Sequence, residues 1–249
     1  IKKGLNNFIE QKGALDIFSI HNVVVDKDFS ESLFEYISNS DRLISLRFIN
    51  TNILLYGNAM KTISKSLSQL KDLQELVFDE CQLNEEKCKS LADVLIRAKK
   101  LKIFEIHNTL NLNNGLSSLI YNLSFFSPNL EMLDISRCQS NLTETVVSLY
   151  KMLRITTSVE VLVARNVVGL NPQLVDQFWV SLGECRSLRV LDIAYSGDIS
   201  SKATNMGNAI AFNAKKKGGL EHIDLTNCVN NVNSIAQLYQ GMCISEYDE

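Results

Sequence analysis

The sequence lacks the features that mark several common classes of protein. Only 2 of its 249 residues are proline and 11 are glycine, so no linker rich in Gly, Ser or Pro divides the chain. No apolar run reaches the ~18–20 residues that a membrane-spanning helix needs. The formal net charge of −3 gives no basic footprint for nucleic acid or for an anionic membrane surface. We therefore expect neither nucleic acid nor a membrane to be a partner.

The residues that carry most enzyme and metal chemistry are also sparse. The six cysteines include no CxxC pair and form no Cys/His cluster with metal-ligand spacing. We expect them to be buried, reduced thiols, which favours a reducing, cytoplasmic compartment. There is no G-x-x-x-x-G-K-[ST] loop, no G-x-G-x-x-G and no H-E-x-x-H. The sequence therefore predicts no catalysis, no cofactor, no metal site and no small-molecule substrate.

The dominant feature is a repeated frame of nine residues. The stretch from Leu130 to Cys138 reads L-x-x-L-x-L-x-x-C, and successive copies start 28 to 32 residues apart. A recurrence this regular is the signature of a leucine-rich-repeat solenoid. The eight copies start at Leu15, Leu43, Leu73, Leu101, Leu130, Val159, Leu188 and Leu220.

Each repeat has two halves. The frame alternates apolar and polar residues, as in Leu133 and Ile135, which predicts a short strand with one buried side. A segment with helical spacing follows, and in the sixth repeat Asn171-Pro172 marks a helix start. Stacked repeats predict an α/β, right-handed superhelix with a curved parallel sheet on the concave face and helices on the convex face.

Alternating strands and helices also describe a doubly wound α/β fold. Strands buried on both faces would be nearly continuous apolar runs, whereas these carry polar residues such as Arg47, Asp134 and Asp192 on one side. The frame repeated in every unit has no reason to exist in a doubly wound sheet. We therefore predict the solenoid.

We expect residues 1–249 to form a single leucine-rich-repeat domain with about eight repeats. The apolar spacing in residues 1–14 predicts the remnant of a preceding repeat. The chain starts at Ile1, without an initiator Met or the apolar segment of a signal peptide. We therefore expect it to be a fragment of a longer protein.

Repeats of this length with a full helix resemble the ribonuclease-inhibitor-like class of leucine-rich repeats. That class includes ribonuclease inhibitor, the GTPase-activating protein for Ran, the repeat domains of NOD-like receptors and CARMIL-type actin regulators. The chain departs from the common pattern at the ninth position of the frame, where five repeats lack Asn or Cys. An Asn stands one place earlier in several of them, as at Asn50 and Asn166.

The outward-facing side chains of the strands predict a binding surface on the concave face. The third position of the frame is apolar in four consecutive repeats, which we expect to align as a ridge flanked by charge. The fifth position carries an acidic set suited to a basic partner. The predicted protein-binding residues are Ile103, Met132, Val161, Val190, Glu105, Asp134, Val163, Arg165 and Asp192.

These features predict a non-catalytic scaffold that binds a protein partner through the concave sheet. The resemblance to CARMIL-like repeats implies a cytoskeletal or signalling assembly. Two alternatives follow from the same resemblance: a GTPase activator similar to the Ran-directed protein, and an inhibitor that plugs a basic enzyme. The sequence leaves open whether the convex helices, rather than the concave sheet, make the contact.

Overall fold

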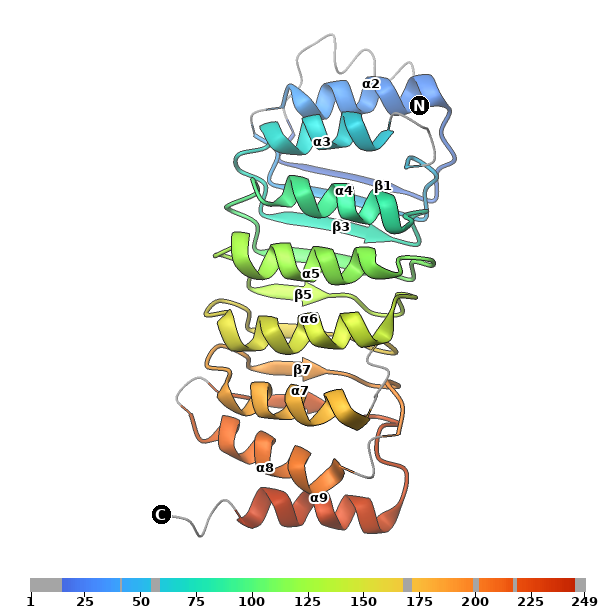
Figure 1. Ribbon diagram of the computed structural model, residues 1–249. Helices are drawn as coiled ribbons and strands as arrows, with labels where there is room; N and C mark the ends of the chain where they lie inside the picture. Colours follow the sequence, from blue (N-terminus) through green and yellow to red (C-terminus); the bar gives the residue numbers. More distant parts are fainter. Residues whose placement is uncertain are drawn as a thin grey trace.

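The computed structural model describes residues 15–40, 42–54, 59–167, 172–198, 202–216 and 219–244 (Figure 1). Strands and helices alternate along the described chain, and the strands form one parallel sheet in the order β1 to β8. The strands are β1 (Ile17–His21), β2 (Ser45–Ile49), β3 (Glu75–Asp79), β4 (Ile103–His107), β5 (Met132–Asp134), β6 (Val161–Val163), β7 (Val190–Asp192) and β8 (His222–Asp224). The helices are α2 (Lys27–Ser38), α3 (Ala59–Gln69), α4 (Glu85–Leu95), α5 (Asn114–Phe126), α6 (Leu142–Ile155), α7 (Pro172–Glu184), α8 (Ala203–Ala214) and α9 (Val232–Ile244).

The register of the sheet matches the repeat frame. Each strand begins two residues after the start of a repeat, and equivalent positions of neighbouring repeats pair with one another, as Leu133 pairs with Phe104 and with Leu162. The helices stack on one face of the sheet and leave the other open (Figure 1). A doubly wound sheet would carry helices on both faces. The predicted α/β solenoid is therefore confirmed.

The core lies between the sheet and the layer of helices. Apolar residues at the fourth and sixth positions of the frame are fully buried in the middle repeats, as at Phe104, Leu133 and Leu162. In the first and last repeats the equivalent Phe18 and Ile223 are only partly buried, because each has a stacked neighbour on one side among the described residues. Burial therefore increases from the ends of the stack towards its centre.

Several helices begin at a side-chain cap. Asp26, Asn84 and Asn141 each accept a hydrogen bond from the backbone N–H three residues on, at 2.7, 3.0 and 3.4 Å. Such caps satisfy amide groups that the helix leaves unpaired. Helix α7 begins at Pro172, as predicted, while Asn171 and residues 1–14 lie outside the described residues. No helix in the described part of the chain is long and apolar enough to cross a membrane.

The backbone conformation explains why Asn stands at the eighth position of the frame and not at the ninth. The eighth position of the frame adopts a left-handed conformation in all eight repeats, with φ between 45° and 62°. Asn tolerates this conformation better than other non-glycine residues because its short polar side chain bonds locally. The eight residues are Asn22, Asn50, Glu80, Asn108, Arg137, Asn166, Tyr195 and Asn227.

In five repeats the ninth position carries a buried donor that bonds to the repeat before. The Cys138 Sγ donates to the carbonyl of Ile106 at 3.1 Å, and the Thr51 hydroxyl donates to that of Val23 at 2.8 Å. Ser and Thr thus replace Cys because each supplies a small donor. The pattern recurs at Cys81, Ser196 and Cys228.

The cysteines are mostly buried, as expected, and none of the six forms a disulfide. Burial raises the pKa of Cys81 and of Cys138 to about 12. The expectation is wrong for Cys243, which is exposed. It lies on α9, the last described helix, and only α8 among the described elements packs against that helix.

Candidate protein-binding surface

The predicted apolar ridge exists as an aligned row across four strands. The register places Ile103 beside Met132, Met132 beside Val161, and Val161 beside Val190. At a strand spacing of ~4.8 Å the row is about 15 Å long. Each of the four side chains is half-buried, so each keeps part of its apolar surface on the concave face.

The fifth position forms a second row beside the ridge. Glu105, Asp134, Val163 and Asp192 pair in register across β4 to β7. Arg165, from the loop after β6, reaches this row and contacts Asp192 at 2.6 Å. The nine predicted residues therefore lie on one continuous surface.

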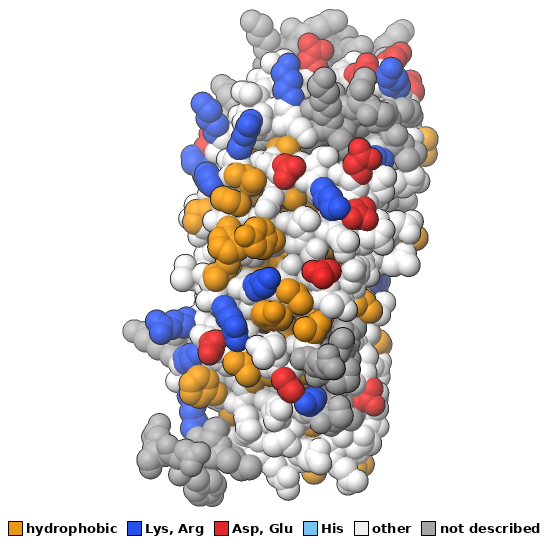
Figure 2. All heavy atoms as spheres, in the orientation of Figure 1, with side chains coloured by type: hydrophobic (Ala, Val, Ile, Leu, Met, Phe, Trp, Pro, Cys, Tyr) orange, Lys and Arg blue, Asp and Glu red, His pale blue; other side chains and the backbone are white. Residues whose placement is uncertain are grey.

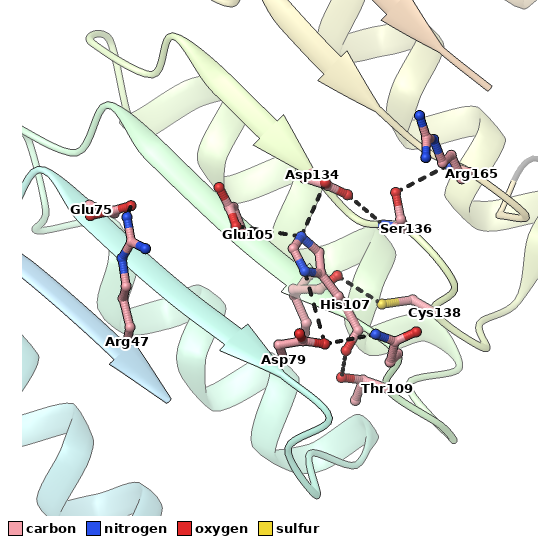
Figure 3. A network of polar contacts seen from close by, with 12 residues as sticks. Arg47, Glu75, Asp79, Glu105, His107, Thr109, Asp134, Ser136, Cys138 and Arg165 are labelled. Atoms are coloured by element: carbon pink, nitrogen blue, oxygen red, sulfur yellow. Dashed lines mark hydrogen bonds and ion pairs between the residues drawn. The ribbon is translucent and has the colours of Figure 1, made fainter. Parts of the chain in front are cut away.

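His107 stands at the centre of a cluster of carboxylates on this surface (Figure 3). Its Nε2 lies 3.1 Å from Asp134 and 3.6 Å from Glu105, and its Nδ1 lies 4.0 Å from Asp79. The Nε2 contact is ionic rather than an aligned hydrogen bond. Three neighbouring strands thus place their acids around one imidazole that is 20% exposed.

The cluster shifts the ionisation of its members. Burial by itself would lower the pKa of His107, but the contact with Asp134 and the charges of Glu105 and Asp79 outweigh it, and the net pKa is raised. Burial raises the pKa of Glu105. For Asp134 burial opposes ionisation, yet His107 and Ser136 more than compensate, and its pKa is lowered. The site therefore favours an imidazolium next to an ionised Asp134.

A second polar cluster centres on Arg165. Its Nε donates to the Asp192 carboxylate at 2.6 Å, and its guanidinium lies 3.8 Å from Asp224. Asp192 is buried, so this pair replaces the hydration that the carboxylate loses. Arg165 and His107 therefore compensate part of the negative charge of the acids at the fifth position.

The same acids also shape the backbone at the ends of the strands. The carboxylates of Asp134, Asp192 and Asp224 each accept a hydrogen bond from the N–H two residues on, at 2.9, 3.2 and 2.9 Å. This turn is one that Asp side chains favour. It coincides with the end of β5, β7 and β8, each of which stops at its Asp. A structural role therefore accounts for part of this acidic column.

The two clusters border a shallow hollow of about 390 Å³ in the concave face. Its lining is polar apart from Val163, and it includes His107, Asp134, Arg165 and Asp192. The hollow lies next to the apolar ridge, because the third and fifth positions of each strand are neighbours on the same side. Apolar and charged side chains are therefore adjacent on the concave face.

The nine binding residues predicted from the sequence include neither His107 nor Asp79. The frame does indicate that the two residues are neighbours, since both occupy its seventh position in consecutive repeats, and Asp79 pairs with His107 in the sheet. What the frame did not reveal is the diagonal contact to Asp134 in the next repeat. Within the described residues, no group of three or more His, Cys, Asp or Glu side chains is arranged to hold a metal ion.

The chain is a leucine-rich-repeat protein, because its repeated frame pairs in register and its parallel strands lie in the sheet in the order of the sequence. No family model matches it. NLR family CARD domain-containing protein 4 of Mus musculus is 30% identical over 73 residues, which is 29% of this chain and 7% of that protein. Its counterpart in Rattus norvegicus is 27% identical over 123 residues, 48% of this chain and 12% of that protein. The chain therefore corresponds to a small part of these relatives.

Among solved structures, a chain from the crystal structure of the Rad7 and Elc1 complex in yeast superposes with a TM-score of 0.49. It is 15% identical in sequence, and the match covers 96% of this chain and 65% of that chain.

Proposed function

We propose that this chain is a protein-interaction scaffold that has no chemistry of its own and binds one protein partner through the concave face of β4 to β7. The observation that carries the proposal is the aligned row of Ile103, Met132, Val161 and Val190. A row of half-buried apolar side chains with a charged border has the composition of a protein-binding hot spot. Met132 adds an adaptable side chain.

In this proposal the polar clusters orient the bound partner. Arg165 and His107 are held by carboxylates on neighbouring strands, so their positions are fixed before a partner arrives. Preorganised charge lowers the entropic cost of binding. A partner with an apolar strip bordered by polar groups of both signs fits this surface, within a cytoskeletal or signalling assembly. The five buried, unpaired thiols suit a reducing cytoplasm.

The test is affinity capture from the source lysate with the wild-type chain and with a Met132→Asp/Val161→Asp double variant. We expect partners captured by the wild type to be lost with the variant, because two carboxylates would interrupt the apolar row. Circular dichroism first establishes that the variant is folded. Retention of the same partners by the folded variant contradicts the proposal.

Ile17→Asp is the matched control. Ile17 occupies the same third position on β1 and is 63% exposed, three strands from the nearest residue of the row. We expect this variant to capture the wild-type partners. If Ile17→Asp also lost the partners, a new acid anywhere on the concave face would be enough to prevent binding. That result would contradict the assignment of the binding site to the apolar row.

A further inference from the structure

The convex face carries apolar side chains that the solenoid does not bury. Phe125 and Phe126 on α5, Ile155 on α6 and Phe212 on α8 are all exposed, and Phe125 and Phe212 keep 53% and 57% of their surface. Figure 2 shows apolar side chains gathered over the middle of this helical face. These residues lie in the last turns of their helices, so they share one edge of the solenoid.

The repeat spacing places two of these side chains at equivalent positions of adjacent helices. Phe126 and Ile155 each stand four residues before the start of the next repeat, at Leu130 and Val159, so they are equivalent on adjacent helices. Tyr121 contacts Phe125 with ring centroids 4.7 Å apart. The aromatic side chains of α5 therefore form a local cluster, and Ile155 lies at the position of α6 that is equivalent to Phe126.

Three cationic side chains along this edge lie over aromatic rings. The Lys99 ammonium lies 5.4 Å from the Phe126 ring, Arg154 lies 5.8 Å from Tyr150, and Lys216 lies 4.8 Å from Phe212. Cations are favoured where helices end, because the exposed carbonyls there carry partial negative charge. In Figure 2 several Lys and Arg side chains lie beside the apolar ones on this side of the face.

A hollow of about 590 Å³ opens on the same edge, between the ends of α6, α7 and α8. Leu153 and Phe212 form apolar parts of its wall, and Arg154, Arg186 and Lys216 supply positive charge. Glu184 is the one acid in the lining, and it pairs with Arg154 at 3.6 Å. Arg186 is exposed and has no ion pair among the described residues. The hollow therefore has a net positive rim around an apolar wall.

We infer that this edge, from Lys99 and Phe126 to Phe212 and Lys216, is a second docking surface, and that it binds a segment of a partner protein in which carboxylates alternate with large apolar side chains. Charge complementarity identifies the partner, since three cations hold aromatic rings on the surface and Arg186 adds a fourth positive group. Aromatic and Arg residues dominate the energetics of such surfaces. An apolar side chain of the segment would occupy the hollow, and its carboxylates would meet the rim.

The probe is a short fluorescent peptide that alternates Asp or Glu with Leu or Phe, and its counterpart has Asn and Gln in place of the acids. We expect the acidic peptide to bind in an anisotropy titration, and the amide peptide to bind at least about tenfold more weakly. Binding should also weaken as salt is raised, because the contacts are exposed charges. Equal binding of the two peptides, or no binding of either, would overturn the inference.

Variants locate the binding site. Phe125→Ser, Phe212→Ser and Arg186→Glu should each weaken binding of the acidic peptide by about thirtyfold, the loss at which a side chain counts as a hot spot. Leu110→Ser removes a side chain that is 63% exposed in the loop before α5, and it should bind as the wild type does. Unchanged binding by the Phe and Arg variants would place the peptide elsewhere and refute the inference.

A final experiment tests whether the edge binds a protein segment or a lipid surface, since aromatic and basic side chains also suit anionic membranes. Vesicles containing phosphatidylserine are added to the preformed peptide complex. We expect no displacement of the peptide and no sedimentation of the chain with the vesicles. Displacement of the peptide by the vesicles would assign the edge to a membrane and contradict the inference.

Discussion

The Nε2 atom of His107, on β4, lies 3.1 Å from a carboxylate oxygen of Asp134 on β5. The two residues occupy different positions of the frame, the seventh and the fifth, so the contact runs diagonally between repeats. Glu105 and Asp79 complete the surroundings of the ring. This contact links the stability of the solenoid to pH.

We expect His107→Gln to destabilise the chain in a pH-dependent manner. The pKa of His107 is raised in the folded chain, above its ordinary value of about 6.5. Its stabilising contribution is therefore complete below about pH 6.5 and is lost as the pH rises through the folded pKa. Urea unfolding near pH 6 should give a free energy of unfolding about 1–3 kcal/mol lower than the wild type, the range for leaving a buried polar group without its partner.

The difference between His107→Gln and the wild type should shrink as the same measurement is repeated at higher pH. His222→Gln is the control, because that ring is exposed on β8 and its replacement should leave the stability near pH 6 unchanged. A difference for His107→Gln that is constant across the pH range would contradict the assigned ion pair.

Tyr195 occupies a left-handed backbone position with φ of 62°. Tyr195→Asn should raise the free energy of unfolding by about 0.5–1 kcal/mol, because Asn tolerates this conformation at lower cost. Tyr195→Phe keeps the backbone preference and should match the wild type. The converse change Asn166→Val, at φ 55°, should lower stability by about 1–2 kcal/mol. Thermal and denaturant unfolding measure all three, and a stabilised Asn166→Val would refute the explanation.

Two helical glycines should respond to alanine in opposite ways. A Cβ on Gly207 of α8 would lie 2.2 Å from the Leu238 carbonyl oxygen of α9, so Gly207→Ala should cost about 1–3 kcal/mol through overpacking. A Cβ on Gly183 of α7 would meet its nearest neighbour, Phe212, at an ordinary 3.6 Å. Gly183→Ala should be neutral or gain about 0.5–1 kcal/mol. Equal effects in chemical denaturation would contradict the close approach of α8 and α9.

Thiol reactivity should distinguish Cys243 from the other five cysteines. Burial raises the pKa of Cys81, Cys88 and Cys138 to about 12, and a protonated, buried thiol is a poor nucleophile. Iodoacetamide should label one thiol in the native chain and six after denaturation. Cys243→Ser should abolish labelling of the native chain. Rapid native labelling of that variant would show that a second thiol is accessible.

Much of the fold follows from the frame itself. Leu133 and Leu162 pair in the sheet because they hold the same position in successive repeats, and an apolar pair repeated eight times specifies register in every strand. The row from Ile103 to Val190 could be predicted for the same reason. The left-handed turn could have been inferred from the recurrent Asn at the eighth position, such as Asn50, although Glu80 and Arg137 conceal the pattern.

The sequence by itself therefore determined the solenoid, its strand register and the residues that face the concave side, because periodicity encodes each of these. The tertiary structure alone decided which charges are compensated. Asp192 meets Arg165 and Asp134 meets His107 through contacts between different frame positions, which depend on side-chain length and burial. It also placed Phe126 beneath Lys99 and Phe212 beneath Lys216 on the convex edge, because these contacts depend on how far each cationic side chain reaches at the helix ends.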